Sequence, residues 1–353
     1  MTKALCFLAV LVALAVAGCG GGDSTARAGK ETSQQEKSAQ AEPEPNPDAE
    51  LAEKEGLKLL EITIDGYPNA DYAGLYLGEK LGYFADVGLK LHVHTPIEPR
   101  RPVLYVASEV VPLGVSHQPE VALARGRGTP IVAVGSWLPQ PTTALIWLKQ
   151  SGIEGIADLK GKTIATEGLQ YQEKLLQTIL ARANLSLDDV KIIRPKYLMV
   201  PALKGGKADA AIGGSWNVEG IQLRQDGFDP VVMPVSKLGV PDYEELVVIS
   251  REDQLEANEA MIGKFFKALS RGNKAAIKHP GAAVKALKAV SPEVPRLNLK
   301  AVAKSVAVTA PMLSRSHRMD GARWRSFENW MGEEELLEES PPPSQLFTNA
   351  YVP

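Results

Sequence analysis

The chain has 353 residues, of which 44% are hydrophobic and 23% are charged, and its formal net charge is -3. This balance indicates a globular protein that is long enough to bury a large core. It argues against a nucleic-acid partner, because there is no surplus of lysine and arginine to neutralise phosphates.

The N-terminus resembles an export signal. One basic residue, Lys3, precedes an uninterrupted apolar run over residues 4–16, which is shorter than the about 20 residues that cross a bilayer. Such a run is typical of a secretory signal peptide. The stretch Val16–Cys19 resembles the lipobox of bacterial lipoproteins, which implies removal of residues 1–18 and a lipid on Cys19. The alternative is an ordinary signal peptide in which this cysteine is incidental.

The next segment, residues 19–56, is predicted to be a disordered tether behind the lipid anchor. It is rich in Glu, Gln, Ser, Ala and Pro, so it cannot bury enough apolar surface to offset the entropy of ordering. The only other cysteine, Cys6, lies in the segment to be removed. The mature domain is therefore expected to hold no disulfide and no cysteine metal site.

From Leu57 onward, short apolar runs alternate with helical patterns, which predicts an α/β fold with largely parallel sheets. Strands are expected at residues 59–64 and 89–93, with a helix that begins at Asp71 between them. The middle of the chain repeats this pattern, with strands expected at residues 162–166, 190–194 and 208–212 and helices at 175–183 and 199–205.

The second of these strands places His92 and His94 on one face, opposite Leu89 and Leu91, because side chains alternate along a strand. Two histidines at this spacing could bind a metal. No third ligand lies near them in the sequence, so we interpret both as the polar side of an edge strand and predict no metal site.

The last part of the chain is predicted to add one strand, over residues 245–250, and several helices. Large apolar residues recur there at helical spacing, among them Phe265, Phe266 and Phe327. Trp324 and Trp330 share this spacing and are expected to belong to the core rather than to a ligand site.

Several ordered motifs cover nearly the whole mature domain. They are YPNADYAGLY from Tyr67, LGYF from Leu81, HQPEVALARGRGTPIVAV from His117, SGIEGIADLKGKTIAT from Ser151, ADAAIGGSWNVEG from Ala208, GVPDYEELV from Gly239 and LFTNAYVP from Leu346. Together they resemble the family of proteins that bind or make the pyrimidine precursor of thiamine.

The resemblance implies a type II periplasmic-binding-protein fold, in which two lobes are joined by two crossovers and a ligand cleft lies between them. Lobe 1 is expected to combine residues 57–139 and 242–353, and lobe 2 to span residues 143–236. The hinge would then lie near residues 139–141 and 237–241.

The family has two branches. The eukaryotic synthase is an intracellular enzyme that uses pyridoxal phosphate and iron, and its lysine and histidine, four residues apart, correspond to Ser116 and Glu120 here. Its cysteine-rich run corresponds to residues 243–248, which hold no cysteine. These positions lack both the amine that forms a Schiff base and the thiols of the synthase. We therefore expect that the chain is not an enzyme and needs no cofactor.

The resemblance and the lipobox together imply a lipid-anchored substrate-binding protein of an ABC importer on the extracytoplasmic side of the cell membrane. This monomer would deliver hydroxymethylpyrimidine or its formylamino form to permease and ATPase subunits. Riboflavin is the alternative ligand, because a larger ring could use the same aromatic walls. Taurine and other sulfonates are less favoured, because the turn at residues 167–171 lacks the serine and threonine that would hold an anion.

The predicted ligand contacts lie at strand ends or helix starts, where open α/β sheets bind ligands. Aromatic rings there could stack on a flat heterocycle, and amides or carboxylates could pair with its edge. For each residue a packing or capping role is the alternative. Trp216 and Glu219 lie in the motif of closest resemblance, whereas many relatives carry histidine at the position of Tyr72. The predicted substrate-binding residues are Tyr67, Asn69, Tyr72, Gln118, Trp137, Trp216, Asn217, Glu219 and Tyr243.

Overall fold

The structure, a computed structural model, describes residues 46–98, 101–290, 298–337 and 341–352. The predicted signal peptide, Cys19 and most of the predicted tether lie outside the described residues. Within these ranges, no helix combines the length and the apolar character that crossing a membrane requires.

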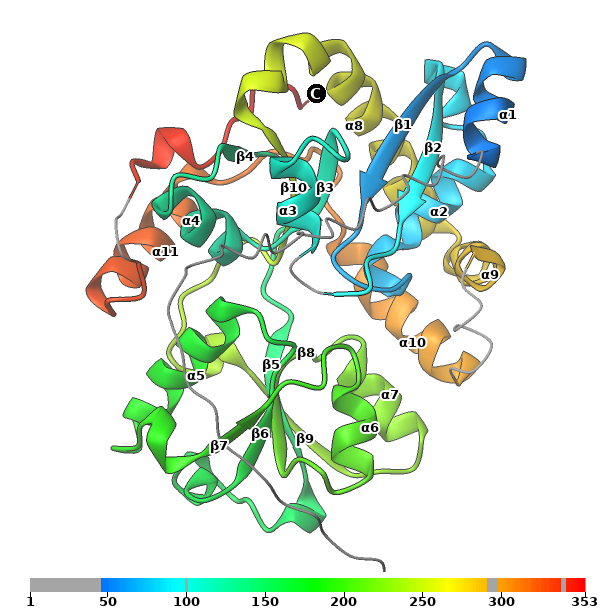
Figure 1. Cartoon of the computed structure of the whole chain (residues 1–353). Helices are drawn as coiled ribbons and strands as arrows, with labels where there is room; N and C mark the ends of the chain where they lie inside the picture. The colour runs from blue at the N-terminus through cyan, green and yellow to red at the C-terminus, as the bar shows by residue number, and fades with distance from the viewer. Residues whose placement is uncertain (1–45, 99–100, 291–297, 338–340, 353) are drawn as a thin grey trace, which may run out of the picture. The chain divides into compact units, whose positions relative to one another are not determined.

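Two five-stranded sheets, one in each of two lobes, organise the described chain (Figure 1). In lobe 1 the strand order is β2-β1-β3-β10-β4. β1 pairs in parallel with β2 and β3, whereas β10 is antiparallel to β3 and β4. The strands are β1 Lys58–Thr63, β2 Leu89–His94, β3 Leu113–Ser116, β4 Ile131–Leu138 and β10 Leu246–Arg251.

The sheet of lobe 2 repeats this plan in the order β7-β6-β8-β5-β9. β6 is parallel to β7 and β8, and β5 is antiparallel to β8 and β9. The strands are β5 Thr143–Leu148, β6 Thr163–Ala165, β7 Lys191–Ile193, β8 Ala210–Ser215 and β9 Pro230–Pro234.

Both sheets are thus mixed, which corrects the expectation of largely parallel sheets. The chain leaves lobe 1 between β4 and β5 and returns between β9 and β10. Parallel neighbours need a long return connection, usually a helix. β5 and β10 each enter a sheet directly from the other lobe, and both pair antiparallel with their neighbours.

Helices cover the faces of both sheets. In lobe 2, α5 lies on one side of the sheet and α6 and α7 lie on the other (Figure 1). The helices of lobe 2 are α5 Gln170–Ala181, α6 Met199–Lys204 and α7 Glu219–Gln225, and those of lobe 1 are α2 Ala73–Lys80, α3 Arg101–Ala107, α4 Gln118–Gly126, α8 Leu255–Lys278, α9 Pro280–Val290, α10 Leu299–Thr309 and α11 Gly321–Glu333.

Two glycines allow α2 and α8 to approach closely. A Cβ atom on Gly272 would lie 2.2 Å from the carbonyl oxygen of Gly74, so neither helix could carry a side chain at this crossing without moving apart.

The core confirms the predicted apolar patterns. Phe265 and Phe266 of α8 are fully buried in the cluster that fills one side of lobe 1. Trp324 and Phe327 of α11 are fully buried in a second cluster, and Trp330 packs against it. This second cluster continues from lobe 2 into α4 and α11 of lobe 1, so apolar contacts also join the lobes.

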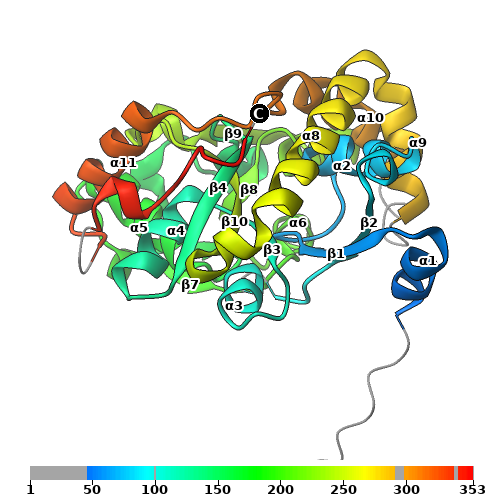
Figure 2. The ribbon, with the colours of Figure 1, turned by 90° about the horizontal axis from the view of Figure 1, so that it is seen from above.

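The end of the predicted tether is helical, which differs from the disorder expected up to Gly56. Helix α1, Pro47–Glu55, begins with Asn46, whose side chain accepts from the Asp48 N–H, and ends at Gly56 in the left-handed conformation. These caps match the residue types that start and stop helices. α1 lies beside β1 and β2 (Figure 2), where Ala52 is buried. Capping and long-range contacts therefore outweigh the polar composition of this segment.

Candidate functional site

A cleft lies where the carboxyl ends of the parallel strands of both lobes meet. Asp65 follows β1, His117 follows β3, Glu167 follows β6 and Tyr197 follows β7. Ligands of open α/β sheets bind at this edge. The residues that line this cleft are Asp65, Gly66, Tyr67, Asn69, Asp71, His117, Glu167, Leu169, Tyr197, Gly213, Ser215, Val218, Glu219 and Glu245.

Direct hydrogen bonds join the two lobes across this cleft. The Tyr67 hydroxyl of lobe 1 donates to Glu219 Oε1 of lobe 2 over 2.8 Å, and the Ser215 N–H donates to Glu219 Oε2 over 2.7 Å. From the opposite side, the Tyr197 hydroxyl donates to the Asp65 carbonyl oxygen over 3.1 Å. Both phenol rings line the cleft, so they can also present a face to a flat ligand.

His117 lies between two carboxylates. Its Nε2 is 3.4 Å from Asp65 Oδ2, and its Nδ1 is 3.3 Å from Glu245 Oε1 and 2.9 Å from the Glu245 carbonyl oxygen. Its ring also packs on Tyr171, with the ring centroids 5.1 Å apart. These contacts fix the plane of the imidazole at the base of the cleft.

The charges of His117 and Glu245 stabilise each other. Burial lowers the pKa of His117, but hydrogen bonds to Asp65 and Glu245 outweigh it and raise that pKa well above its ordinary value. Burial raises the pKa of Glu245, but hydrogen bonds and the charge of His117, together with hydrogen bonds from the Thr143 N–H and hydroxyl, lower that pKa below its usual value. The imidazole is therefore charged at neutral pH, and so is Glu245.

Glu245 also joins the two crossover segments. Its Oε2 accepts from the Thr143 N–H over 2.8 Å and its Oε1 from the Thr143 hydroxyl over 2.7 Å. Thr143 opens β5 directly after the first crossover, and Glu245 precedes β10 at the end of the second. One buried carboxylate thus connects the base of the cleft to both connections between the lobes.

Two other carboxyls in the cleft hold their protons near neutral pH. Burial, assisted by the nearby Asp65, raises the pKa of Asp71 to about 8. Burial also raises the pKa of Glu167 to about 8, although a hydrogen bond from Gln172 opposes the change. A neutral carboxyl both donates and accepts a hydrogen bond, so these groups can pair with a ligand edge that offers both functions.

Glu167 is held by the residues around it. The Gln172 side-chain amide donates to Glu167 Oε2 over 2.8 Å and accepts from the Glu167 N–H over 2.9 Å. Gly213, with a φ of +105°, makes room for this amide, because a Cβ atom there would lie 2.3 Å from Gln172 Nε2. Glu167 itself lines the cleft.

The lining is acidic. It contains five carboxyl groups, on Asp65, Asp71, Glu167, Glu219 and Glu245, and one imidazole, while none of the described lining residues is lysine, arginine or cysteine. An anionic group would meet carboxylates there instead of paired cations. The cleft therefore suits a ligand that is neutral or cationic and rich in hydrogen-bond donors.

Three of the predicted ligand contacts, Tyr67, Asn69 and Glu219, line the cleft. Asn69 also has a capping role, because its side chain accepts from the Asp71 N–H over 2.8 Å. The other predicted contacts are outside the lining: they are Tyr72, Gln118, Trp137, Trp216, Asn217 and Tyr243.

Most of these outer residues hold the acidic residues of the cleft. The Tyr72 hydroxyl donates to Asp65, and the Tyr243 hydroxyl donates to Glu245 Oε2 over 3.2 Å. Asp71 accepts from Asn217 at its carboxyl, over 2.7 Å, and from Trp137 at its carbonyl oxygen, over 2.8 Å.

Gln118 and Trp216 support the backbone beside the cleft. Gln118 Oε1 accepts from the Glu244 N–H over 2.7 Å. The Trp216 indole donates to the Pro141 carbonyl oxygen in the first crossover over 3.3 Å, and its ring packs against the apolar cluster of lobe 2.

Sequence reasoning missed Asp65, His117, Glu167, Tyr197 and Glu245 as cleft residues. The first four directly follow strands of the predicted α/β pattern or lie close to their ends, so their position was the available signal. A preference for aromatic stacking partners explains why the charged residues were passed over, but it does not explain the omission of Tyr197.

Comparison with known proteins assigns the chain to a family. The family described as NMT1/THI5 like matches residues 69–283, more than half of the chain. The chain belongs to the NMT1/THI5-like family. The formylaminopyrimidine-binding protein of Halalkalibacterium halodurans is 31% identical over 236 residues, which cover 67% of this chain and 72% of that protein. The 4-amino-5-hydroxymethyl-2-methylpyrimidine phosphate synthase of Aspergillus parasiticus is 28% identical over 223 residues, 60% of this chain and 65% of that protein. The predicted family resemblance is confirmed.

Solved structures confirm the fold. The alkanesulfonate-binding protein SsuA of Xanthomonas axonopodis pv. citri, bound to MOPS, matches with a TM-score of 0.66 over 82% of this chain and 98% of that chain. The sequence identity is 17%, so this likeness concerns the fold alone. The chain has the two-lobed α/β fold of periplasmic binding proteins, as predicted.

Proposed function

We propose that this NMT1/THI5-like protein binds a pyrimidine precursor of thiamine in the cleft between its lobes and delivers it to an ABC importer. The observation that carries the proposal is the set of proton-holding carboxyls, Asp71 and Glu167, beside two phenol rings, Tyr67 and Tyr197. The family and the related formylaminopyrimidine-binding protein support the same ligand class.

An aminopyrimidine fits this chemistry. Its edge places an exocyclic amine, which donates, beside a ring nitrogen, which accepts. A protonated carboxyl offers the complementary pair, a carbonyl oxygen and a hydroxyl. Glu167 Oε2 already accepts from Gln172, so we assign Oε1 to the ring edge, with Tyr67 and Tyr197 against the ring faces.

The same lining disfavours a sulfonate. A sulfonate is anionic at every physiological pH, and the described lining carries carboxyl groups without a lysine or arginine. The shared fold of the alkanesulfonate-binding protein therefore does not extend to its ligand class. Riboflavin remains the competing ligand, because its ring edge also offers donors and acceptors.

The protein is proposed to bind its ligand without converting it. Ser116 is a buried residue at the end of β3, and Glu120 lies in the first turn of α4. These are the positions that correspond to the lysine and histidine of the synthase branch. Neither residue type forms a Schiff base with pyridoxal phosphate.

Isothermal titration of the purified protein with four ligands tests the function. 4-Amino-5-hydroxymethyl-2-methylpyrimidine or its formylamino form should bind at least about 100-fold more tightly than taurine, a difference of about 2.7 kcal/mol. Riboflavin is titrated in parallel. Tight binding of taurine would contradict the proposal. Tight binding of riboflavin, without binding of either pyrimidine, would show that riboflavin is the ligand.

We further propose that the chain is a lipoprotein anchored through Cys19, with residues 1–18 removed and a tether leading to α1. Cys19→Ala should move the protein from the membrane fraction to the soluble or unprocessed pool, without a change in ligand affinity. Cys6→Ala is the matched control, because that cysteine lies in the segment to be removed, and it should leave the distribution unchanged. A processed Cys19→Ala protein that still sediments with membranes would refute the anchor.

A further inference from the structure

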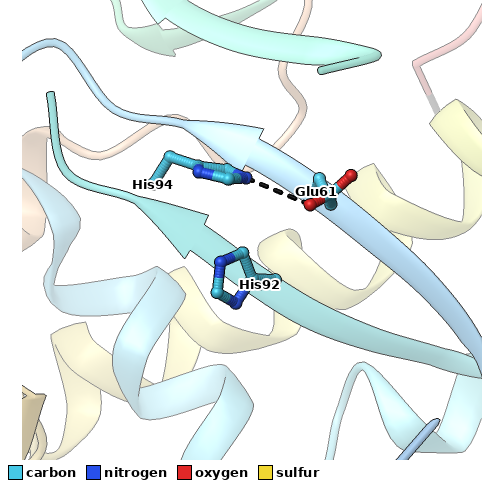
Figure 3. A group of neighbouring side chains, drawn as sticks. All are labelled: Glu61, His92 and His94. Carbon is cyan, nitrogen blue, oxygen red and sulfur yellow. Dashed lines mark hydrogen bonds and ion pairs between the residues drawn. The ribbon is translucent and has the colours of Figure 1, made fainter. Parts of the chain in front are cut away.

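A cluster of metal-ligating side chains lies on paired strands of lobe 1, and none of its members is among the lining residues of the ligand cleft. Glu61 of β1 and His92 and His94 of β2 each offer one ligand atom, and these atoms all lie within 4.8 Å of one another. Figure 3 shows the three side chains on the same side of the paired strands. Each is half-buried.

The pairing of β1 with β2 supplies the third ligand that the sequence did not reveal. The parallel register sets Glu61 opposite His92 and Thr63 opposite His94. From this position Glu61 Oε1 reaches diagonally to His94 Nε2, 3.2 Å away. Residues on one face of paired strands approach within reach of such contacts, although Glu61 and His92 are 31 positions apart in the chain.

We propose that Glu61, His92 and His94 form a binding site for Zn²⁺. Two imidazoles and one carboxylate are a common zinc ligand set, with water in the fourth position. Ligand atoms around tetrahedral zinc lie ~3.4 Å apart, given Zn–N and Zn–O bonds of about 2.0 to 2.1 Å. The Glu61–His94 pair already has this spacing, and the remaining approach requires only side-chain rotation on a fixed pair of strands.

Helix α1 orients the site. His92 Nδ1 lies 2.9 Å from Asp48 Oδ2, which leaves Nε2 of this ring for the ion. Histidines that bind metals usually donate their other ring N–H to a carboxylate, which fixes the ring and raises its basicity. Asp48 therefore acts as a positioning residue for His92.

Lys90 lies on the same face of β2, two residues before His92, and its charge is balanced. Its Nζ lies 3.3 Å from Asp48 Oδ1 and 2.8 Å from Glu79 Oε1. The ammonium of Lys90 thus pairs with the second carboxylate oxygen of Asp48. This contact keeps Asp48 from binding the Zn²⁺ ion directly. The fourth ligand is then water.

Zinc titration against a chromophoric chelator tests the site. The full-length chain is used without a histidine tag and with Cys6 and Cys19 replaced by serine, because free thiols would bind zinc themselves. We expect one Zn²⁺ per chain. H92A and H94A should each weaken binding by at least about 100-fold and D48N by about 10-fold, since loss of an outer partner alone costs 10- to 100-fold.

His279→Ala is the matched control. This histidine is exposed at the end of α8, outside the cluster, so its loss should leave zinc affinity unchanged. Melting curves of the zinc-free variants check folding, and H92Q and H94Q replace any alanine variant that unfolds. Ca²⁺, which prefers six to eight oxygen ligands, should not compete. Absence of zinc binding in the parent chain, or equal affinity in H94A and H279A, would overturn the site.

Discussion

Glu167 shows how one side chain sets the chemistry of the cleft. Its pKa of about 8 means that the carboxyl is largely protonated at neutral pH. A bound aminopyrimidine would use this proton in the hydrogen bond to its ring nitrogen and would raise the pKa further. Below about pH 8 the proton is already present, so binding requires no uptake. Above it, each bound ligand must take a proton from solution, and the affinity falls as pH rises.

The pH dependence of binding tests this role of Glu167. Between about pH 8 and 9.5 the affinity of the parent protein should fall by about 15-fold in total, with the slope approaching 10-fold per pH unit at the upper end. Glu167→Gln keeps one donor and one acceptor but cannot titrate, so its affinity should stay nearly flat over the same range. Glu167→Ala should weaken binding by about 5- to 150-fold through the loss of two hydrogen bonds.

Glu173→Gln is the matched control, because this residue of α5 pairs with Arg194 outside the cleft. It should bind like the parent protein at every pH. If the affinity of Glu167→Gln keeps the full pH dependence, another carboxyl must titrate instead. Asp71, whose pKa is also about 8, is then the candidate.

At the scale of elements, the sequence was enough to predict features that depend on the residue pattern within a single strand or helix. The alternation in β2 and the apolar spacing that buries Trp324 and Phe327 could be read directly from the sequence. The helix α1 was missed because its polar composition outweighed the cap residues Asn46 and Gly56 in the prediction. The contacts of Asp48 with Lys90 and His92 are not visible in the sequence. Composition describes a segment by itself, and it misses partners that the fold brings to it.

Only part of the candidate site was predicted, because its other residues also depend on partners that lie far away in the sequence. Strand ends mark the edge at which a ligand binds, and Tyr67 and Glu219 were found in this way. Whether a side chain at that edge points into the cleft or back to the fold depends on its partners. Tyr72 turns its hydroxyl to Asp65 and Trp137 its indole to the Asp71 carbonyl oxygen, so both support acidic residues that a search for stacking rings passed over.

At the scale of the whole molecule, the lobes are held together by more than the cleft. Asn217, which follows β8 in lobe 2, donates to the Thr309 hydroxyl of α10 over 2.8 Å, and the Ser305 hydroxyl of α10 donates to the Asn217 carbonyl oxygen. Neither Ser305 nor Thr309 lines the cleft. These bonds exist only when α10 meets lobe 2, so they favour the arrangement in which the lobes touch. Hinge motion at the crossovers would break them.

The double variant Ser305→Ala/Thr309→Val should therefore shift the protein toward an open form while all cleft residues remain. Loss of two neutral hydrogen bonds disfavours the closed form by about 1 to 3 kcal/mol. Because only the closed form binds with full affinity, the apparent dissociation constant should rise, by up to about 5- to 150-fold where the open form already dominates in the parent protein. Calorimetry measures this rise, and small-angle scattering of the ligand-free protein should give a radius of gyration no smaller than that of the parent.

The matched control, Ser250→Ala/Ser270→Ala, removes hydrogen bonds to the carbonyl oxygens of Pro112 and Arg315 within lobe 1. It should lower thermal stability and leave affinity unchanged, and equal losses of affinity in the two double variants would show that closure of the lobes does not control binding.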